Sequence, residues 1–369
     1  MFYNYNMHSR PNGDGRHKTR PGRSADLSKG GTLMKLLTIA VPCYNSQDYM
    51  RRAVESLLPG GDRVEILIVD DGSSDDTGRI ADEYAQKYPD TVRAIHQENA
   101  GHGGAVMTGI QNARGLYFKV IDSDDWADGD VYPLLLDTLG RFTEQPLDMV
   151  ICNYIYDKAG ARHKHTSHYR GKLPEGRVFG WEETGRFHKG QYLLMHAITY
   201  RTELLRECGM DLPRHTFYVD DLYAYVPLPE TRRLYYLDAD LYHYYIGREG
   251  QSVQEEVMIR RIDQQLHVNR LMLETVDPFK VEPERKKRYM LGFLGIVSTI
   301  SLVLLTKMGT AESERKKAEL WDFMRWTNPA FFRAFRRSLL GVILRLPGKA
   351  GRQFILFWYR IARLVVGFN

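Results

Sequence analysis

Between residues 36 and 121 the sequence alternates short apolar runs with segments of helical periodicity, and this alternation limits the possible folds more than any other feature. The expected strands are 36–42, 65–69, 92–96 and 117–121, and the expected helices are 48–58, 77–88 and 104–113. Strand–helix repeats this short require crossover connections, which give a parallel sheet covered by helices on both faces. We therefore predict an α/β domain with a Rossmann-like, mostly parallel sheet and flanking helices.

Polar residues directly follow three of the expected strands. The first strand runs into Pro-Cys-Tyr-Asn at 42–45, the second into Asp-Asp-Gly-Ser-Ser at 70–74, and the fourth into Asp-Ser-Asp-Asp at 122–125. The carboxyl ends of parallel strands meet at one edge of the sheet, where open α/β sheets bind their ligands. The sequence therefore predicts a ligand site at this edge.

The acidic segment after the fourth strand suggests a metal site. Residues i and i+2 of an extended chain point the same way, so Asp122 and Asp124 can face one ligand together. Two adjacent carboxylates repel each other, and a divalent cation with oxygen ligands compensates for this repulsion. The alternative is that Asp124 or Asp125 only caps the following helix.

The charge of the chain is distributed unevenly. Residues 1–35 hold 7 Lys and Arg against 2 Asp and Glu, and residues 281–369 hold 17 against 6, so the segment between them has a net charge of −11. An acidic middle is unlike a nucleic-acid-binding domain, whose basic surface lies on the folded reading domain. Anionic lipid is the better partner for the basic C-terminal part.

Composition suits an intracellular globular protein. The hydrophobic content of 43% and charged content of 26% are ordinary, and the three cysteines show no metal-like spacing. The polar, basic start has no apolar stretch of the kind that secretory signals contain. We expect a disordered basic tail at 1–34 and a cytoplasmic protein.

Four segments together resemble the successive motifs of family-2 glycosyltransferases of the cell-surface polysaccharide type. They are Val-Pro-Cys-Tyr-Asn at 41–45, Ile-Val-Asp-Asp-Gly-Ser-Ser-Asp-Asp-Thr at 68–77, Asn-Ala-Gly-His-Gly-Gly at 99–104 and Ile-Asp-Ser-Asp-Asp-Trp at 121–126. The resemblance implies a GT-A fold over residues 35–254. A nucleotide-binding half would occupy 35–126 and an acceptor half 127–254.

The resemblance also implies roles for individual residues at the donor site. Asp71 corresponds to the carboxylate that accepts a hydrogen bond from a uracil-type base, and Asp122 and Asp124 correspond to the D-x-D pair that serves the ribose and an Mn²⁺ or Mg²⁺ ion. A mobile basic loop would bring Arg248 to the diphosphate. The complete set implied for the nucleotide sugar is Pro42, Tyr44, Asn45, Asp71, Asp122, Ser123 and Arg248.

An acid pair at 220–221 resembles the element that holds the family's general base. Asp221 matches the base position, and Asp220 is the second candidate. The alternative is that Asp220 caps a helix and Asp221 is an ordinary acid of its first turn. Of the histidines, His102 and the group His163, His165 and His168 are predicted to be loop residues rather than ligands.

Residues 255–369 are helical by pattern and lie outside the resemblance. The apolar segment 289–306 is marginally long enough to span a bilayer, but its Ser, Thr and Gly residues favour a buried or interfacial helix. The segments 330–346 and 353–368 are basic and amphipathic, which is typical of helices that lie on anionic membranes or pack as a bundle. The Trp-Asp-Phe-Met-Arg-Trp segment at 321–326 is interpreted as helix packing.

Together with these features, the resemblance implies an inverting, metal-dependent glycosyltransferase. It would move a sugar from a UDP-sugar to a hydroxyl of a glycan or lipid-linked acceptor in cell-surface polysaccharide or glycolipid synthesis, on the inner face of the cell membrane. One alternative is a polyprenyl-phosphate sugar transferase, whose anionic acceptor needs no general base. The other is a non-catalytic, membrane-associated protein that binds nucleotide sugars.

Overall fold

The computed structural model describes residues 35–158, 164–187, 191–247 and 254–366. The predicted tail at 1–34, Arg248 and His163 lie outside these ranges, so the predictions made for them are not addressed by the structure.

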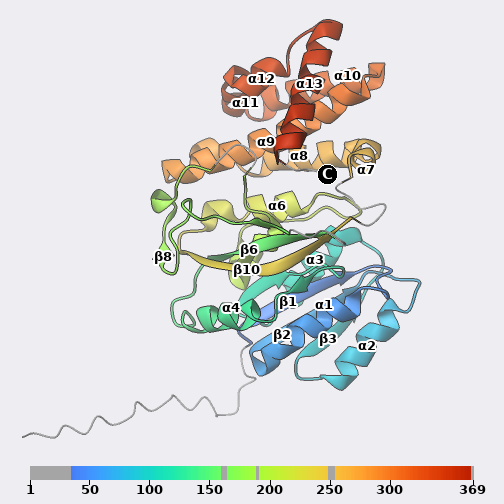
Figure 1. Cartoon of the computed structure of the whole chain (residues 1–369), viewed down its shortest axis with the longest axis vertical. Helices are drawn as coiled ribbons and strands as arrows, with labels where there is room; N and C mark the ends of the chain where they lie inside the picture. The colour runs from blue at the N-terminus through green and yellow to red at the C-terminus, as the bar shows by residue number, and fades with distance from the viewer. Residues whose placement is uncertain (1–34, 159–163, 188–190, 248–253, 367–369) are drawn as a thin grey trace, which may run out of the picture. The chain divides into compact units, whose positions relative to one another are not determined.

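The alternation between residues 36 and 121 forms the first half of the sheet, as predicted (Figure 1). Strands β2, β1 and β4 lie side by side and parallel, and β3 adds to β2 at the edge. All residues of β1 and β2 are buried, because helices cover both faces. The elements are β1 (Leu37–Cys43), α1 (Met50–Leu57), β2 (Val64–Asp70), α2 (Thr77–Lys87), β3 (Val92–His96), α3 (Gly101–Asn112) and β4 (Tyr117–Val120).

The second half of the sheet is mixed. Strand β9 (Ile198–Arg201) runs antiparallel to β4 and to β6 (Met149–Lys158), while β10 (Leu234–Ile246) is parallel to β6. The strand order is β3-β2-β1-β4-β9-β6-β10-β5, where β5 is Trp126–Ala127. The antiparallel β9 places its first residues beside the carboxyl end of β4, next to the predicted site.

The predictions for this second half were incomplete. The strands expected at 235–239 and 242–246 form one strand, β10, whose register shifts against β6 between Leu237 and Tyr242. Helix α4 (Val131–Gly140) was not predicted, and His165 lies in a short strand, β7 (His165–Ser167), rather than in a loop. The remaining elements are β8 (Val178–Phe179), α5 (Thr202–Glu207) and α6 (Asp220–Tyr225).

The C-terminal part is helical, as predicted, and begins with a layer that lies against the sheet domain (Figure 1). Helices α8 and α9 pack on each other, and α10 and α13 then pack on α9. The segment predicted as one helix at 330–346 divides at Ser338, whose hydroxyl accepts from the amide of Gly341 (3.1 Å) and begins α12. The helices are α7 (Glu255–Arg260), α8 (Ile262–Thr275), α9 (Glu284–Met308), α10 (Ala311–Thr327), α11 (Pro329–Arg337), α12 (Leu339–Ile343) and α13 (Gly348–Val366).

Helix α9 contains the apolar segment that the sequence left open as a membrane span. By length and composition it is the one described helix that could cross a membrane, yet 67% of its most apolar window is buried inside the protein. A core helix of a soluble protein meets the same criteria. The burial agrees with the predicted packed helix.

Polar contacts fasten the start of α9 to the sheet domain. The Lys286 ammonium is buried and donates to the carbonyls of Pro229 (2.7 Å) and Thr231 (2.8 Å), and burial lowers its pKa to about 8. The Tyr289 hydroxyl accepts from the amide of Leu193 (2.8 Å). These contacts join the helical part to the second half of the sheet domain.

We predict that Lys286→Met lowers the free energy of unfolding by about 1–3 kcal/mol, because two carbonyls lose their donor. Urea unfolding followed by circular dichroism measures this change. Lys280→Met is the matched control, since the Lys280 side chain is 83% exposed and its removal is expected to cost less than about 0.5 kcal/mol. Equal stabilities for the two variants would contradict this role of Lys286.

Candidate active site

The loop after β1 is held against the loop after β2. The Asn45 side-chain oxygen accepts from the amide of Ser74 (2.9 Å), and the Asn45 amide donates to the Ser73 hydroxyl (3.0 Å). Tyr44 is 56% exposed beside them, whereas Pro42 is buried in β1. An exposed aromatic ring at the carboxyl end of a strand is available to stack on a planar ligand.

Asp71 lies at the same edge but already has several partners. One carboxylate oxygen accepts from the Gln97 amide group (2.6 Å) and the Ala100 amide (2.8 Å), and the other accepts from the Gly101 amide (2.8 Å). Asp71 is therefore a buried cap for the start of α3. Its contact with a nucleotide base remains a prediction.

The segment after β4 brings Asp122, Ser123 and Asp124 to the surface of the site, while Asp125 is buried. The Ser123 hydroxyl lies 2.8 Å from the Ser46 hydroxyl of the first loop. Asp125 accepts from the Tyr242 hydroxyl (2.5 Å) and the Tyr245 amide (2.7 Å). These bonds fasten the acidic segment to β10, and burial together with the charge of Asp122 raises the pKa of Asp125 well above its usual range.

His102 lies in this site, and its prediction as a loop residue was wrong. It is in the first turn of α3, and its Nε2 is 2.8 Å from an oxygen of Asp122. Burial opposes a charge on the imidazole, but the charge and hydrogen bond of Asp122, together with the charges of Asp220 and Asp71, raise the pKa of His102. Burial likewise favours neutral Asp122, yet the charge of His102 lowers the pKa of that carboxyl. The two side chains form a charge-assisted pair.

The acid pair at 220–221 starts helix α6, which faces the same site. Burial raises the pKa of Asp220, although the positive charge of His102 opposes the shift. Burial and the negative charge of Asp220 raise the pKa of Asp221 well above its usual range. The structure therefore brings Asp220 within electrostatic range of His102 and Asp122, from a part of the chain about a hundred residues away.

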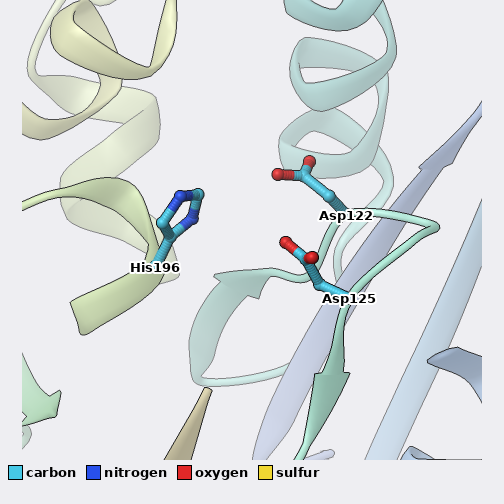
Figure 2. Close-up of side chains that lie close together, drawn as sticks. All are labelled: Asp122, Asp125 and His196. Atoms are coloured by element: carbon cyan, nitrogen blue, oxygen red, sulfur yellow. The ribbon is translucent and has the colours of Figure 1, made fainter. Parts of the chain in front are cut away.

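His196 was not identified from the sequence as a site residue. Figure 2 shows its imidazole opposite the carboxylates of Asp122 and Asp125, and one potential ligand atom from each residue lies within 4.8 Å of those of the other two. Burial lowers the pKa of His196 to about 4. Nothing in the sequence distinguished it, since it lies in a short 3₁₀ turn (Met195–Ala197) before β9 and its place depends on β9 pairing with β4.

The residues present fit a divalent cation. Carboxylate oxygens and a neutral imidazole are ordinary ligands of Mn²⁺, and Asp122, Asp125 and His196 form the group within the described ranges whose spacing suits a metal ion. Asp124 is next to this group in the chain. His165 and His168 are exposed and belong to no such group among the described residues.

Comparisons with known proteins agree with the fold and the motifs. The family model for glycosyl transferase family 2 matches residues 38–203. The putative glycosyltransferase EpsH of Bacillus subtilis is 30% identical over 298 residues, which cover 76% of this chain and 79% of EpsH. Chondroitin synthase of Escherichia coli is 43% identical over 118 residues, which cover 31% of this chain and 17% of that protein.

A structural relative has the same architecture. The crystal structure of S. aureus TarS 1–349 in complex with UDP-GlcNAc superposes with a TM-score of 0.64. It is 20% identical, and the match covers 88% of this chain and 89% of that one. This likeness confirms the predicted GT-A fold, including the helical C-terminal region.

We predict that Tyr242→Phe lowers the free energy of unfolding by about 1–3 kcal/mol, because the buried Asp125 carboxylate loses its hydroxyl donor. Tyr223→Phe is the matched control, since the buried Tyr223 hydroxyl has no hydrogen-bond partner among the described residues. Its removal is expected to change stability by less than about 0.5 kcal/mol. Chemical unfolding of both variants tests the difference, and equal losses would contradict it.

Proposed function

Because the chain belongs to glycosyl transferase family 2, we propose that it transfers a sugar from a UDP-sugar to a hydroxyl of a glycan or lipid-linked acceptor, with inversion at the anomeric carbon. The observation that supports this most is the convergence of Asp122, His102 and Asp220 from three separate elements at one edge of the sheet. A transferase needs donor-binding and proton-accepting groups side by side. The similarity to chondroitin synthase supports a role in polysaccharide synthesis.

The donor would bind across the loops after β1, β2 and β4. Tyr44 offers an exposed ring for the base, and Asn45 fixes the shape of the loop that carries it. Asp71 would accept from a uracil-type base while it caps α3, since each carboxylate oxygen can accept more than one hydrogen bond. Pro42, Ser123 and Arg248 complete the proposed donor set.

Asp122 and Asp124 would hold Mn²⁺ or Mg²⁺ at this edge. When bound, such an ion neutralises the charge that develops on the leaving diphosphate. His102 keeps the Asp122 carboxylate oriented through its 2.8 Å contact. Tyr242 holds the backbone of Asp122 from β10, because its hydroxyl accepts from the Asp122 amide (3.2 Å).

Asp221 would act as the general base. The acceptor hydroxyl oxygen attacks the anomeric carbon, its proton moves to the Asp221 carboxylate, and the bond to the diphosphate oxygen breaks with the electron pair leaving on the diphosphate. A carboxyl with a raised pKa is a better proton acceptor than an ordinary aspartate once it is ionised. Asp220 is the second candidate because it starts the same turn of α6.

The C-terminal helices would place the enzyme on the inner face of the cell membrane. Six of the twelve large apolar side chains that are exposed among the described residues lie between Leu339 and Trp358. Four cations, Lys317, Arg345, Lys349 and Arg352, line a cavity of about 540 Å³ beside them. Apolar side chains next to cations complement the surface of an anionic bilayer.

We predict that Asp221→Asn retains UDP-sugar affinity but lowers kcat by about 10²–10⁴-fold, because the amide cannot accept the proton. Calorimetry measures donor binding, and UDP release measures turnover over a panel of UDP-sugars with Mn²⁺. Asp220→Asn, made in parallel, separates the two candidates. Because the pKa of Asp221 is raised, the rate of the wild type should fall on acidification at a higher pH than an ordinary aspartate would give.

Three outcomes would contradict parts of this proposal. Normal turnover of Asp221→Asn with loss in Asp220→Asn would move the base to Asp220. Normal turnover of both variants on a polyprenyl phosphate would favour the phosphate-acceptor enzyme, since its nucleophile is already ionised. Donor binding without transfer to any acceptor would favour a non-catalytic binding protein.

We further predict that Phe357→Ser combined with Trp358→Ser weakens binding to phosphatidylglycerol vesicles at least tenfold. Both side chains are about half exposed on α13, and burying an aromatic side chain in lipid contributes about 1.5–3 kcal/mol. Co-sedimentation measures the binding, and Leu134→Ser, at an exposed apolar position on α4, is the control. Wild-type binding should weaken from 0.1 M to 1 M salt, as the Debye length falls from about 10 Å to about 3 Å.

A further inference from the structure

His196 is a buried side chain with an unsatisfied polar atom beside the acidic segment. It is 6% exposed, and its Nδ1 has no hydrogen-bond partner among the described residues. Buried polar atoms in folded proteins nearly always have a partner, so an orphaned one calls for an explanation. Its position opposite two carboxylates suggests a missing ligand (Figure 2).

The contacts that hold the His196 imidazole in place do not involve its Nδ1. The ring stacks on Tyr242 at 4.7 Å between centroids and packs against Tyr244 at 4.5 Å. The Lys119 ammonium, in β4, donates to the backbone carbonyls of His196 (2.8 Å) and Ile198 (3.2 Å). Aromatic packing therefore fixes the His196 ring, and the buried Lys119 fixes the backbone on which it stands.

The two carboxylates opposite His196 are engaged to different degrees. Both oxygens of Asp125 already accept hydrogen bonds, at 2.5 Å from Tyr242 and 2.7 Å from Tyr245, so Asp125 is a support for the site. Asp122 is partly exposed, and its closest partners are His102 at 2.8 Å and the weaker contact with Tyr242 at 3.4 Å. Asp122 is therefore the better placed ligand of the two.

We propose that His196 is a direct ligand of the divalent cation, together with Asp122, and that it makes the site selective for Mn²⁺ over Mg²⁺. The inference rests on the metal dependence in the proposed function. Mg²⁺ strongly prefers oxygen ligands and keeps its water, whereas Mn²⁺ accepts an imidazole nitrogen more readily. Because the fold already orients the His196 nitrogen toward the site, the site should bind Mn²⁺ in preference to Mg²⁺.

The first test measures the metal directly on the full chain. Mn²⁺ bound to the wild type in the presence of UDP is studied by electron spin-echo envelope modulation, which detects ¹⁴N of a coordinated imidazole. The expected result is a histidine nitrogen signal that disappears in His196→Asn. A bound Mn²⁺ without any nitrogen signal in the wild type would overturn the inference, even if the variant failed to fold.

The second test measures selectivity by titration with Mn²⁺ and Mg²⁺ in the presence of UDP. His196→Asn should weaken Mn²⁺ binding at least tenfold and change Mg²⁺ binding less than about twofold, since Mg²⁺ gains little from an imidazole. His243→Asn is the matched control, because His243 is also buried beside two carboxylates, Asp157 (3.0 Å) and Asp128 (3.3 Å). It should leave the ratio of the two affinities unchanged.

The outcomes separate this inference from the function it rests on. Equal Mn²⁺ affinity for the wild type and His196→Asn would overturn the role of His196 and leave the transferase proposal standing. If Mn²⁺ binding depends on His196 but the protein transfers no sugar, the role of His196 would be supported and the proposed activity would be contradicted. A wild type that binds no divalent cation with UDP would overturn both the metal dependence and the role of His196.

Discussion

Repulsion between carboxylates is the constraint on which this site depends. Asp122, Asp125, Asp220 and Asp221 come from two distant segments, and burial makes their mutual repulsion stronger than it would be in water. The fold offsets part of it with the imidazole of His102 and with hydrogen bonds to Asp125. In the proposed function, a divalent cation beside Asp122 would offset the remaining negative charge and that of a bound diphosphate.

The first half of the fold could be predicted because its cues are local. Each buried strand there is a continuous apolar run, and each helix has a clear apolar face, so predicted and observed bounds of β1 to β4 differ by only a residue or so. The second half depends on pairing between distant segments. The fusion of two expected strands into β10 needs a register shift near Asp240, which a single sequence does not reveal.

The candidate site was partly predictable for the same reason. Acids that directly follow strands, such as Asp71 and Asp122, were found because a parallel sheet must bring its carboxyl ends together. His102 and His196 were missed, since each acquires its place only through tertiary contacts. His102 reaches Asp122 from the start of α3, and His196 reaches it because β9 runs antiparallel to β4.

The helical C-terminal part is an integral part of the packed structure. Helix α9 has one side against the sheet domain through Tyr289 and Lys286, and α13 packs on it from the other side. At its far end Lys307 pairs with Glu255 of α7, and Glu255 also accepts from Tyr359 of α13 (2.6 Å). The acidic residue that joins these three helices comes shortly after β10, the strand that supports Asp125. If α13 lay on a membrane, the side chains of Tyr359, Glu255 and Lys307 would therefore connect it to α9, which packs against the sheet domain.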